Sequence, residues 1–252
     1  MFLFPSRRHD PLPLPYSTEV HCHILPGIDD GAPDPSSSLA LISRLQEMGV
    51  RRIIATSHIT EGTFPNRRAT IADAYSRLKA EADAQSVILP PVSLAAEHRI
   101  DDDFLRLDSQ DIMPLVGPGS EPTDSPLLLV ENSYAVQRAD LDSILFDLRL
   151  KGYRPVLAHP ERYLYYHSHR DRYEALHASG TLFQVNLLSL AGYNGKDVRK
   201  VAEWLLEHDY IDLLGSDMHH LRHADALKEY LTSSASKRHF NHLEGRLLND
   251  SL

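Results

Sequence analysis

The sequence predicts an α/β fold in which seven parallel strands alternate with helices around a barrel. The chain has 252 residues, a usual length for one barrel domain of this class. Hydrophobic residues make up 42% of it, which is enough for a large core. Short β-branched runs recur between stretches of helical periodicity, and this alternation is typical of βαβ units. We therefore expect one domain over residues 18–252.

The first strand opens the stretch EVHCHILPGIDDG, residues 19–31. Alternate side chains of a strand point to the same face, so His21 and His23 should point one way and Cys22 the other. A Pro-Gly turn and two neighbouring acids follow. Residues 33–49 form the first predicted helix, because apolar residues recur at helical spacing and a glycine ends the pattern.

The remaining elements follow the same pattern of short apolar strands and amphipathic helices. The predicted strands are residues 50–58, 87–97, 127–131, 155–159, 181–186 and 211–219. The predicted helices are residues 70–84, 138–150, 170–178, 196–208, 224–231 and 240–248. Residues 98–126 lack periodicity apart from a short helix near Phe104, and they predict a functional loop or a decoration of the barrel. Residues 1–17, rich in proline, are expected to form a flexible arm.

The composition of the chain argues against several kinds of partner and location. The formal net charge of -9 argues against a nucleic acid or a membrane surface as the partner. No apolar run reaches the length of a membrane span, and the apolar stretch at the N-terminus is too short for a secretory signal. The single cysteine, Cys22, excludes an internal disulfide and fits a reducing compartment, so we expect a cytoplasmic protein.

The strand ends carry the residues that point to chemistry. They are His21, His23, His58, Glu97, Glu131, His159, Asn186, Asp217 and His219. In a parallel barrel the carboxyl ends of the strands converge on one face, so these side chains should meet there. They are too many for one tetrahedral ion, and mixed imidazole and carboxylate ligands suit Mn, Fe or Zn. Two or three such ions would activate water for the hydrolysis of a phosphate ester.

The sequence also resembles a known family. The motifs HCHILPGIDDG, ATSH, LLLVE, AHPERY and GSDMHH are similar to those of the PHP superfamily, and most similar to its bacterial protein-tyrosine phosphatases encoded with capsule and exopolysaccharide genes. The resemblance covers about residues 20–221. It implies a distorted (β/α)7 barrel and three divalent ions, usually Mn²⁺. It also implies that a metal-activated hydroxide hydrolyses phosphotyrosine on the tyrosine-rich tail of a partner autokinase.

The resemblance also implies a role for each motif residue. The first ion would be held by His21, His23, Glu97 and Asp217, the second by Glu97, Glu131 and His159, and the third by His58, His219 and an aspartate of the IDDG turn. Spacing from His23 favours Asp29 as that aspartate, with Asp30 in competition. Arg162 and Arg222 would bind the substrate phosphate, and Arg162, His58 and Asp217 would act in the reaction itself. The roles of Arg67 and Arg68 stay open.

Three other functions fit parts of the pattern. A histidinol-phosphate or other small phosphomonoester phosphatase of the same superfamily would share the metal motifs. An amidohydrolase would also begin with H-x-H, but the glutamates that end the third and fourth strands argue against it. A non-catalytic, metal-binding regulatory module is the third alternative, and the completeness of the ligand set argues against that reading.

Overall fold

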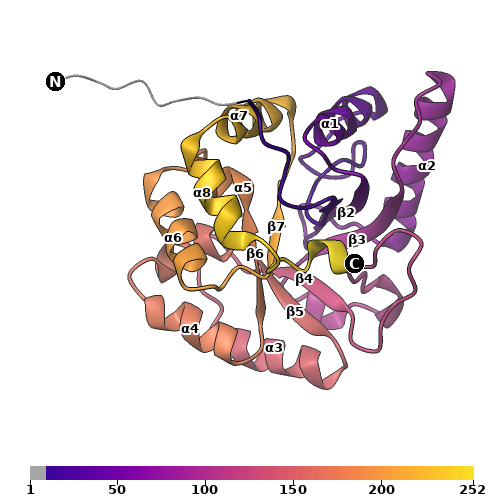
Figure 1. Ribbon diagram of the computed structural model, residues 1–252. Helices are drawn as coiled ribbons and strands as arrows, with labels where there is room; N and C mark the ends of the chain where they lie inside the picture. The colour runs from indigo at the N-terminus through magenta and orange to yellow at the C-terminus, as the bar shows by residue number, and fades with distance from the viewer. Residues whose placement is uncertain (1–9) are drawn as a thin grey trace.

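The computed structural model describes residues 10–252 and shows one sheet of seven parallel strands in sequential order (Figure 1). The strands are β1 (Thr18–Glu19), β2 (Arg52–Ile59), β3 (Val92–Arg99), β4 (Leu127–Glu131), β5 (Arg154–Ala158), β6 (Leu182–Asn186) and β7 (Leu213–Gly215). Each pairs in parallel with the next. The predicted α/β class, with seven alternating strands, is confirmed.

The first and last strands meet beyond their ends. A parallel bridge joins Cys22 to Met218, the amide of His23 donates to the carbonyl of Met218 at 3.0 Å, and that of Asp217 donates to the carbonyl of His21 at 2.7 Å. These bonds nearly close the sheet into a barrel. The prediction that His21 and His23 lie within a strand is wrong in detail, because β1 ends at Glu19 and the chain beyond it forms an isolated bridge in place of a continuous ladder.

The helices surround the strands (Figure 1). They are α1 (Pro35–Glu47), α2 (Arg68–Ala84), α3 (Leu141–Leu150), α4 (Arg170–Ala178), α5 (Leu187–Ala191), α6 (Lys196–Glu207), α7 (Leu221–Leu231) and α8 (Ser234–Leu243). The short helix α5 was not predicted, since five residues carry almost no periodicity. The last helix was predicted at residues 240–248. It begins earlier because the side chain of Ser233 caps it by accepting from the amide of Ser236.

Alternation along the strands directs the end residues into the barrel. Its interior is filled by Val20, Ile54, Ala95, Leu115, Leu127, Leu129, Val156, Ala158 and Leu213. Ala95 in β3 and Leu129 in β4 belong to this cluster. Side chains two residues further on share the same face, so Glu97 and Glu131 also point inward. At the carboxyl ends of the strands, the side chains of Glu97 and Glu131 thus lie above the apolar interior.

Both termini of the described chain pack against the barrel. The side chain of Asn249 donates to the carbonyls of Thr18 and Leu214, next to the strands β1 and β7. Part of the expected arm is also packed, because the amide of Leu14 bonds the carbonyl of Met48 and Leu14 is buried. Residues 1–9 of that arm lie outside the described residues.

The aperiodic segment 98–126 is folded back on the barrel. Arg67 donates to Asp103 at 2.7 Å, Arg68 donates to the carbonyl of Ile112 at 3.1 Å, and Leu115 forms an antiparallel bridge with Leu127. The two arginines thus anchor this segment. Among helices of residues 10–252, none has both the length and the hydrophobicity required to cross a membrane.

Candidate metal centre

The candidate metal centre lies at the carboxyl ends of the strands and contains nine side chains. They form four overlapping groups, and within each group the nitrogen or oxygen atoms lie within 4.8 Å of one another. The nine residues are His21, His23, Asp30, His58, Glu97, Glu131, His159, Asp217 and His219. They are far apart in sequence and meet because the parallel strands converge at this end. Every expected ligand is here except Asp29, and Asp30 stands in its place.

Four of these side chains form a compact group with nearly equal spacings. Nε2 of His21 lies 3.2 Å from Oε2 of Glu97 and 3.4 Å from Oδ1 of Asp217. Nε2 of His23 lies 3.4 Å and 3.3 Å from the same two oxygens, and 3.3 Å from Nε2 of His21. Ligands arranged tetrahedrally at about 2.1 Å from an ion are about 3.4 Å apart. Each imidazole is therefore spaced from the other and from both carboxylates as the ligands of one divalent ion would be.

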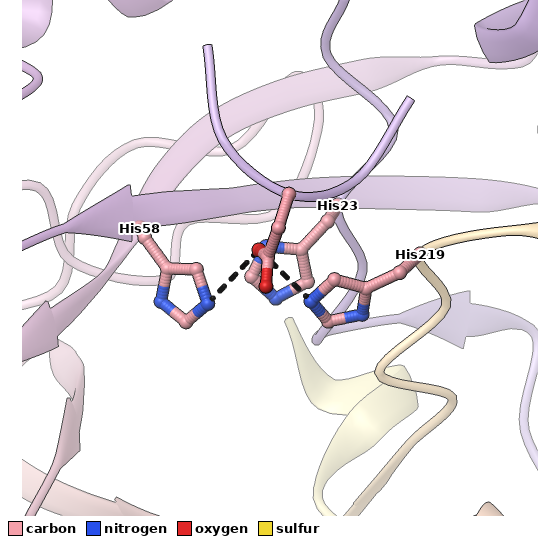
Figure 2. A group of neighbouring side chains, drawn as sticks. His23, His58 and His219 are labelled. Carbon is pink, nitrogen blue, oxygen red and sulfur yellow. Dashed lines mark ion pairs between the residues drawn. The ribbon is translucent and has the colours of Figure 1, made fainter. Parts of the chain in front are cut away.

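A second group surrounds the carboxylate of Asp30. Its Oδ1 lies 3.5 Å from Nε2 of His58 and 3.3 Å from Nε2 of His219. Figure 2 shows the rings of His23, His58 and His219 gathered around one carboxylate, with dashed lines to the last two. This arrangement favours Asp30 over Asp29 as the aspartate of a third ion site.

A third group centres on Glu97. Its Oε1 lies 2.8 Å from Nε2 of His159, and its Oε2 lies 3.1 Å from Nδ1 of His58. Glu131 lies next to both rings, 3.7 Å from Nδ1 of His58 and 3.8 Å from Nε2 of His159. Glu97 also belongs to the compact group, so its carboxylate is shared between the two groups.

Asp29 contacts a candidate ligand, His23, from the side of the ring that faces away from the centre. Its side chain is fully buried, and its Oδ2 lies 3.0 Å from Nδ1 of His23. The same carboxylate accepts from the amides of Gly31 and His58. The preference for Asp29 as a ligand was drawn from spacing alone, and the structure groups Asp30 with the other candidate ligands instead. The choice between the two aspartates stays a prediction. Asp29 fixes the ring of His23 so that Nε2 faces the centre.

Other histidines are oriented in the same way. Nδ1 of His21 lies 2.6 Å from Oε1 of Gln184, whose amide nitrogen donates to Asn186. Asn186 in turn donates to Oδ2 of Asp217 at 2.7 Å. Nδ1 of His219 lies 2.9 Å from the carbonyl of Asp217. The sequence reasoning missed Gln184, and the available signal was a polar residue inside an otherwise apolar strand. Such partners set the tautomer and direction of metal-binding imidazoles.

The backbone is bent to present two of the side chains. His159 has a backbone φ of 34° and Asp217 one of 49°, values that residues other than glycine rarely adopt. Such conformations persist where surrounding structure fixes them, and they concentrate at functional sites. Gly215 allows close packing nearby, because a Cβ on it would lie 2.5 Å from Cβ of His21.

The electrostatics of the centre fit bound cations. Burial lowers the pKa of His21, but the carboxylates of Glu97 and Asp217 outweigh burial and raise that pKa to about 9. Burial and the charge of Glu97 raise the pKa of Glu131 to about 8. Oε2 of Glu97, Oε2 of Glu131 and Nδ1 of His58 are buried without a hydrogen bond. Buried polar atoms normally have partners, and divalent ions would supply them here in place of protons.

Known proteins share this fold and sequence pattern. One solved structure matches with a TM-score of 0.72 and 28% identity, over 92% of this chain and 95% of that chain. It belongs to a study of YwqE from Bacillus subtilis and CpsB from Streptococcus pneumoniae, described as unique metal-dependent tyrosine phosphatases. The tyrosine-protein phosphatase YwqE of Bacillus subtilis (strain 168) is 29% identical over 207 residues, 81% of this chain and 78% of that protein.

A second relative, the tyrosine-protein phosphatase CpsB of Streptococcus pneumoniae, is 28% identical over 208 residues, 81% of this chain and 83% of that protein. The family model CpsB/CapC, described as capsular polysaccharide synthesis, matches residues 17–242. The chain belongs to the CpsB/CapC family. This match confirms the resemblance drawn from the motifs, and the structural likeness confirms the distorted (β/α)7 barrel.

In this CpsB/CapC protein the centre opens into a cavity of about 330 Å³, which we name the central cavity. Arg162 reaches it from the turn after β5 and donates from one guanidinium nitrogen to Oδ2 of Asp217 at 2.9 Å. The guanidinium carbon lies 4.7 Å from the ring centroid of Tyr134, whose hydroxyl is 3.0 Å from Nε2 of His159. Tyr134 lines the cavity and was not predicted, because it comes from an irregular segment without a motif.

Arg222, the other arginine expected to bind phosphate, lies outside the lining of the central cavity. It is exposed in the first turn of α7 and lines a neighbouring cavity between α1 and α7. Its part in phosphate binding stays a prediction.

Cys22 packs in the hydrophobic core, fully buried, as expected from the strand alternation. A cysteine phosphatase needs its thiolate at an anion-binding loop that opens a helix, and Cys22 is not in such a loop. We expect Cys22→Ser to retain metal-dependent activity and to lose about 1–3 kcal/mol of stability from the buried hydroxyl. Turnover, metal content and thermal unfolding should be measured together. Abolished turnover with metal and fold intact would reveal a thiol nucleophile.

Proposed function

We propose that this protein is a metal-dependent protein-tyrosine phosphatase that uses three divalent ions, preferably Mn²⁺ and alternatively Fe or Zn. One observation carries the proposal: nine candidate metal ligands lie together at one end of the barrel, and six of them line the same cavity as Arg162. Divalent ions at such a centre polarise a phosphoryl oxygen and lower the pKa of bound water. The names of the relatives support the choice of phosphotyrosine.

The proposed ligand sets follow the observed groups. His21, His23, Glu97 and Asp217 would hold the first ion, and Glu97, Glu131 and His159 the second. His58, His219 and Asp30 would hold the third. His58 directs Nδ1 to the carboxylate of Glu97 and Nε2 to that of Asp30, so its ring lies between two of the sites.

Arg162 would orient the substrate. One guanidinium nitrogen of Arg162 donates to Asp217, and the other two form no hydrogen bond with a described residue. A guanidinium donates parallel hydrogen bonds to phosphate oxygens better than an ammonium does. Placed beside the ligand Asp217, Arg162 would stabilise charge that spreads over the phosphoryl oxygens in the transition state. His58 and Asp217 would act in the reaction by fixing the geometry of the centre around that group.

The substrate would be a tyrosine-phosphorylated protein in capsule or exopolysaccharide synthesis, and we propose the tyrosine-rich tail of a bacterial autokinase. The family description supports the pathway. The lone cysteine of the chain supports a cytoplasmic location.

Substrate class can be tested on the purified, Mn²⁺-loaded protein. The proposal predicts a much higher kcat/KM for a phosphotyrosine peptide than for a matched phosphoserine peptide or histidinol phosphate. A preference for histidinol phosphate would assign the protein to the small-molecule branch instead. Absence of turnover on all three, with metal bound, would favour a regulatory module.

Acid should weaken both metal binding and activity. Histidine ligands must be neutral to bind, and the pKa of His21 near 9 means that an ion displaces a proton at neutral pH. Each displaced proton lowers the affinity about tenfold per pH unit as the pH falls. Mn²⁺ titrations and phosphatase rates at several pH values should show this decline. A rate that rises steadily from neutral pH to about pH 5, where free histidine is protonated, would contradict it.

A further inference from the structure

A groove of about 650 Å³ lies beside the central cavity, between α1 and α7. We name it the α1/α7 groove. Its apolar wall is formed by Ala32, Pro33, Ala40, Leu41 and Leu221, and Arg222 lies at its edge. The proposed chemistry does not use this space, because all nine candidate ligands except His219 lie outside its lining.

The groove adjoins the candidate centre. His219 and His220 line both the α1/α7 groove and the central cavity. A phosphotyrosine whose phosphate reaches the centre therefore has its main chain near this shared wall. Successive Cα atoms are about 3.8 Å apart, so the side chain of a neighbouring residue can reach the groove.

The chemistry of the groove suits an apolar side chain with an acidic neighbour. Leu221 is 44% exposed, so its side chain is available to a ligand in the groove. Arg222 is exposed and forms no ion pair with another described residue. A substrate segment with an apolar residue beside the phosphotyrosine, followed by a carboxylate, would bury the first and pair with the second.

We propose that the α1/α7 groove binds the substrate polypeptide next to its phosphotyrosine and selects an apolar residue there. The inference rests on the proposed function and adds a determinant of substrate choice to it. A small phosphomonoester ends at its phosphate-bearing group and does not reach the groove. The groove therefore contributes to the hydrolysis of polypeptides only.

A further cavity adjoins the central cavity at residues other than those shared with the α1/α7 groove. A polar cavity of about 470 Å³ shares His58 and Tyr134 with the central cavity, and Thr60, Thr63 and Arg99 line it. The parts of the polypeptide on either side of the phosphotyrosine would then lie in these two cavities. A small-molecule substrate, by contrast, needs only one opening to enter and leave its site.

The test compares two substrates in groove variants of the Mn²⁺-loaded protein. Ala40→Glu and Leu221→Asp place a charge on the apolar wall from two different helices. We expect each to lower kcat/KM for a phosphotyrosine peptide with a flanking leucine by about tenfold or more, the usual effect of losing an apolar subsite. Turnover of p-nitrophenyl phosphate should be unchanged in both variants.

Two controls make the result specific. Ala175→Glu on the exposed face of α4 and Leu150→Asp in α3, where the leucine is 71% exposed, introduce the same charges far from the groove. Both should retain wild-type activity on both substrates. In addition, replacing the flanking leucine of the peptide by glycine should lower kcat/KM for the wild type but not for Leu221→Asp.

Two outcomes would overturn the inference. Wild-type kcat/KM on the peptide in both groove variants would show that the groove binds no part of the substrate. An equal loss on peptide and p-nitrophenyl phosphate would trace the effect to the metal centre. Failure of the wild type to hydrolyse any phosphotyrosine peptide is a different result, because it refutes the proposed function itself.

Discussion

His159→Ala should lose one bound ion and most phosphatase activity. His159 lies 2.8 Å from Glu97, and its backbone adopts a left-handed conformation that directs it into the centre. Mutation of a residue that only orients a metal ligand costs about 10–100-fold in affinity or activity. Loss of the ligand itself should therefore cost about 10²-fold or more in kcat. Metal content by elemental analysis and phosphotyrosine turnover measure the two effects.

The variant needs a control for folding, because His159 is buried. His242→Ala removes a partly exposed histidine that pairs with Asp209, outside the centre, and should keep full metal content and turnover. Thermal unfolding of the metal-free forms shows whether His159→Ala still folds. Full metal content with wild-type turnover in His159→Ala would remove this residue from the ligand set.

Arg162→Ala should lower kcat/KM for a phosphotyrosine peptide by about 10²–10³-fold, the usual cost of one preorganised donor at a developing charge. Arg162→Lys should also lose activity, because an ammonium does not reproduce the two parallel hydrogen bonds of a guanidinium. Metal occupancy should stay at the wild-type level in both. Kinetics and elemental analysis on the same preparations give the two readouts.

An alternative role for Arg162 is visible in the structure. It donates to Asp217, a candidate ligand of the first ion, and could act by holding that carboxylate in place. In that case Arg162→Ala would lose metal together with activity, and Arg162→Lys, which keeps the ion pair, would recover both. Near-normal kinetics in Arg162→Ala would leave phosphate binding to the metals alone.

The barrel and most of the centre were predictable because position and chemistry coincide at the strand ends. Glu97 and Glu131 each follow an apolar strand, and the parallel topology brings such ends together. The choice between Asp29 and Asp30 was not predictable, because adjacent residues in a turn have nearly the same spacing from His23. Their side chains point in different directions because of local hydrogen bonds, such as the one that the amide of Gly31 donates to Asp29.

The supporting residues were harder to find for a different reason. Gln184 and Tyr134 act on ligands that are distant in sequence, His21 and His159, and neither belongs to a recognisable motif. Their roles depend on which residues pack beside them in the fold. A single sequence contains the residue types but not these pairings.

We propose that three divalent ions bind together at the carboxyl end of this barrel. Anomalous diffraction at the manganese edge, on crystals of the Mn²⁺-loaded protein, tests it most directly. We expect three peaks, one within the group of His21, His23, Glu97 and Asp217, one beside Glu131 and His159, and one beside Asp30, His58 and His219. A single peak, or peaks remote from these side chains, would contradict it.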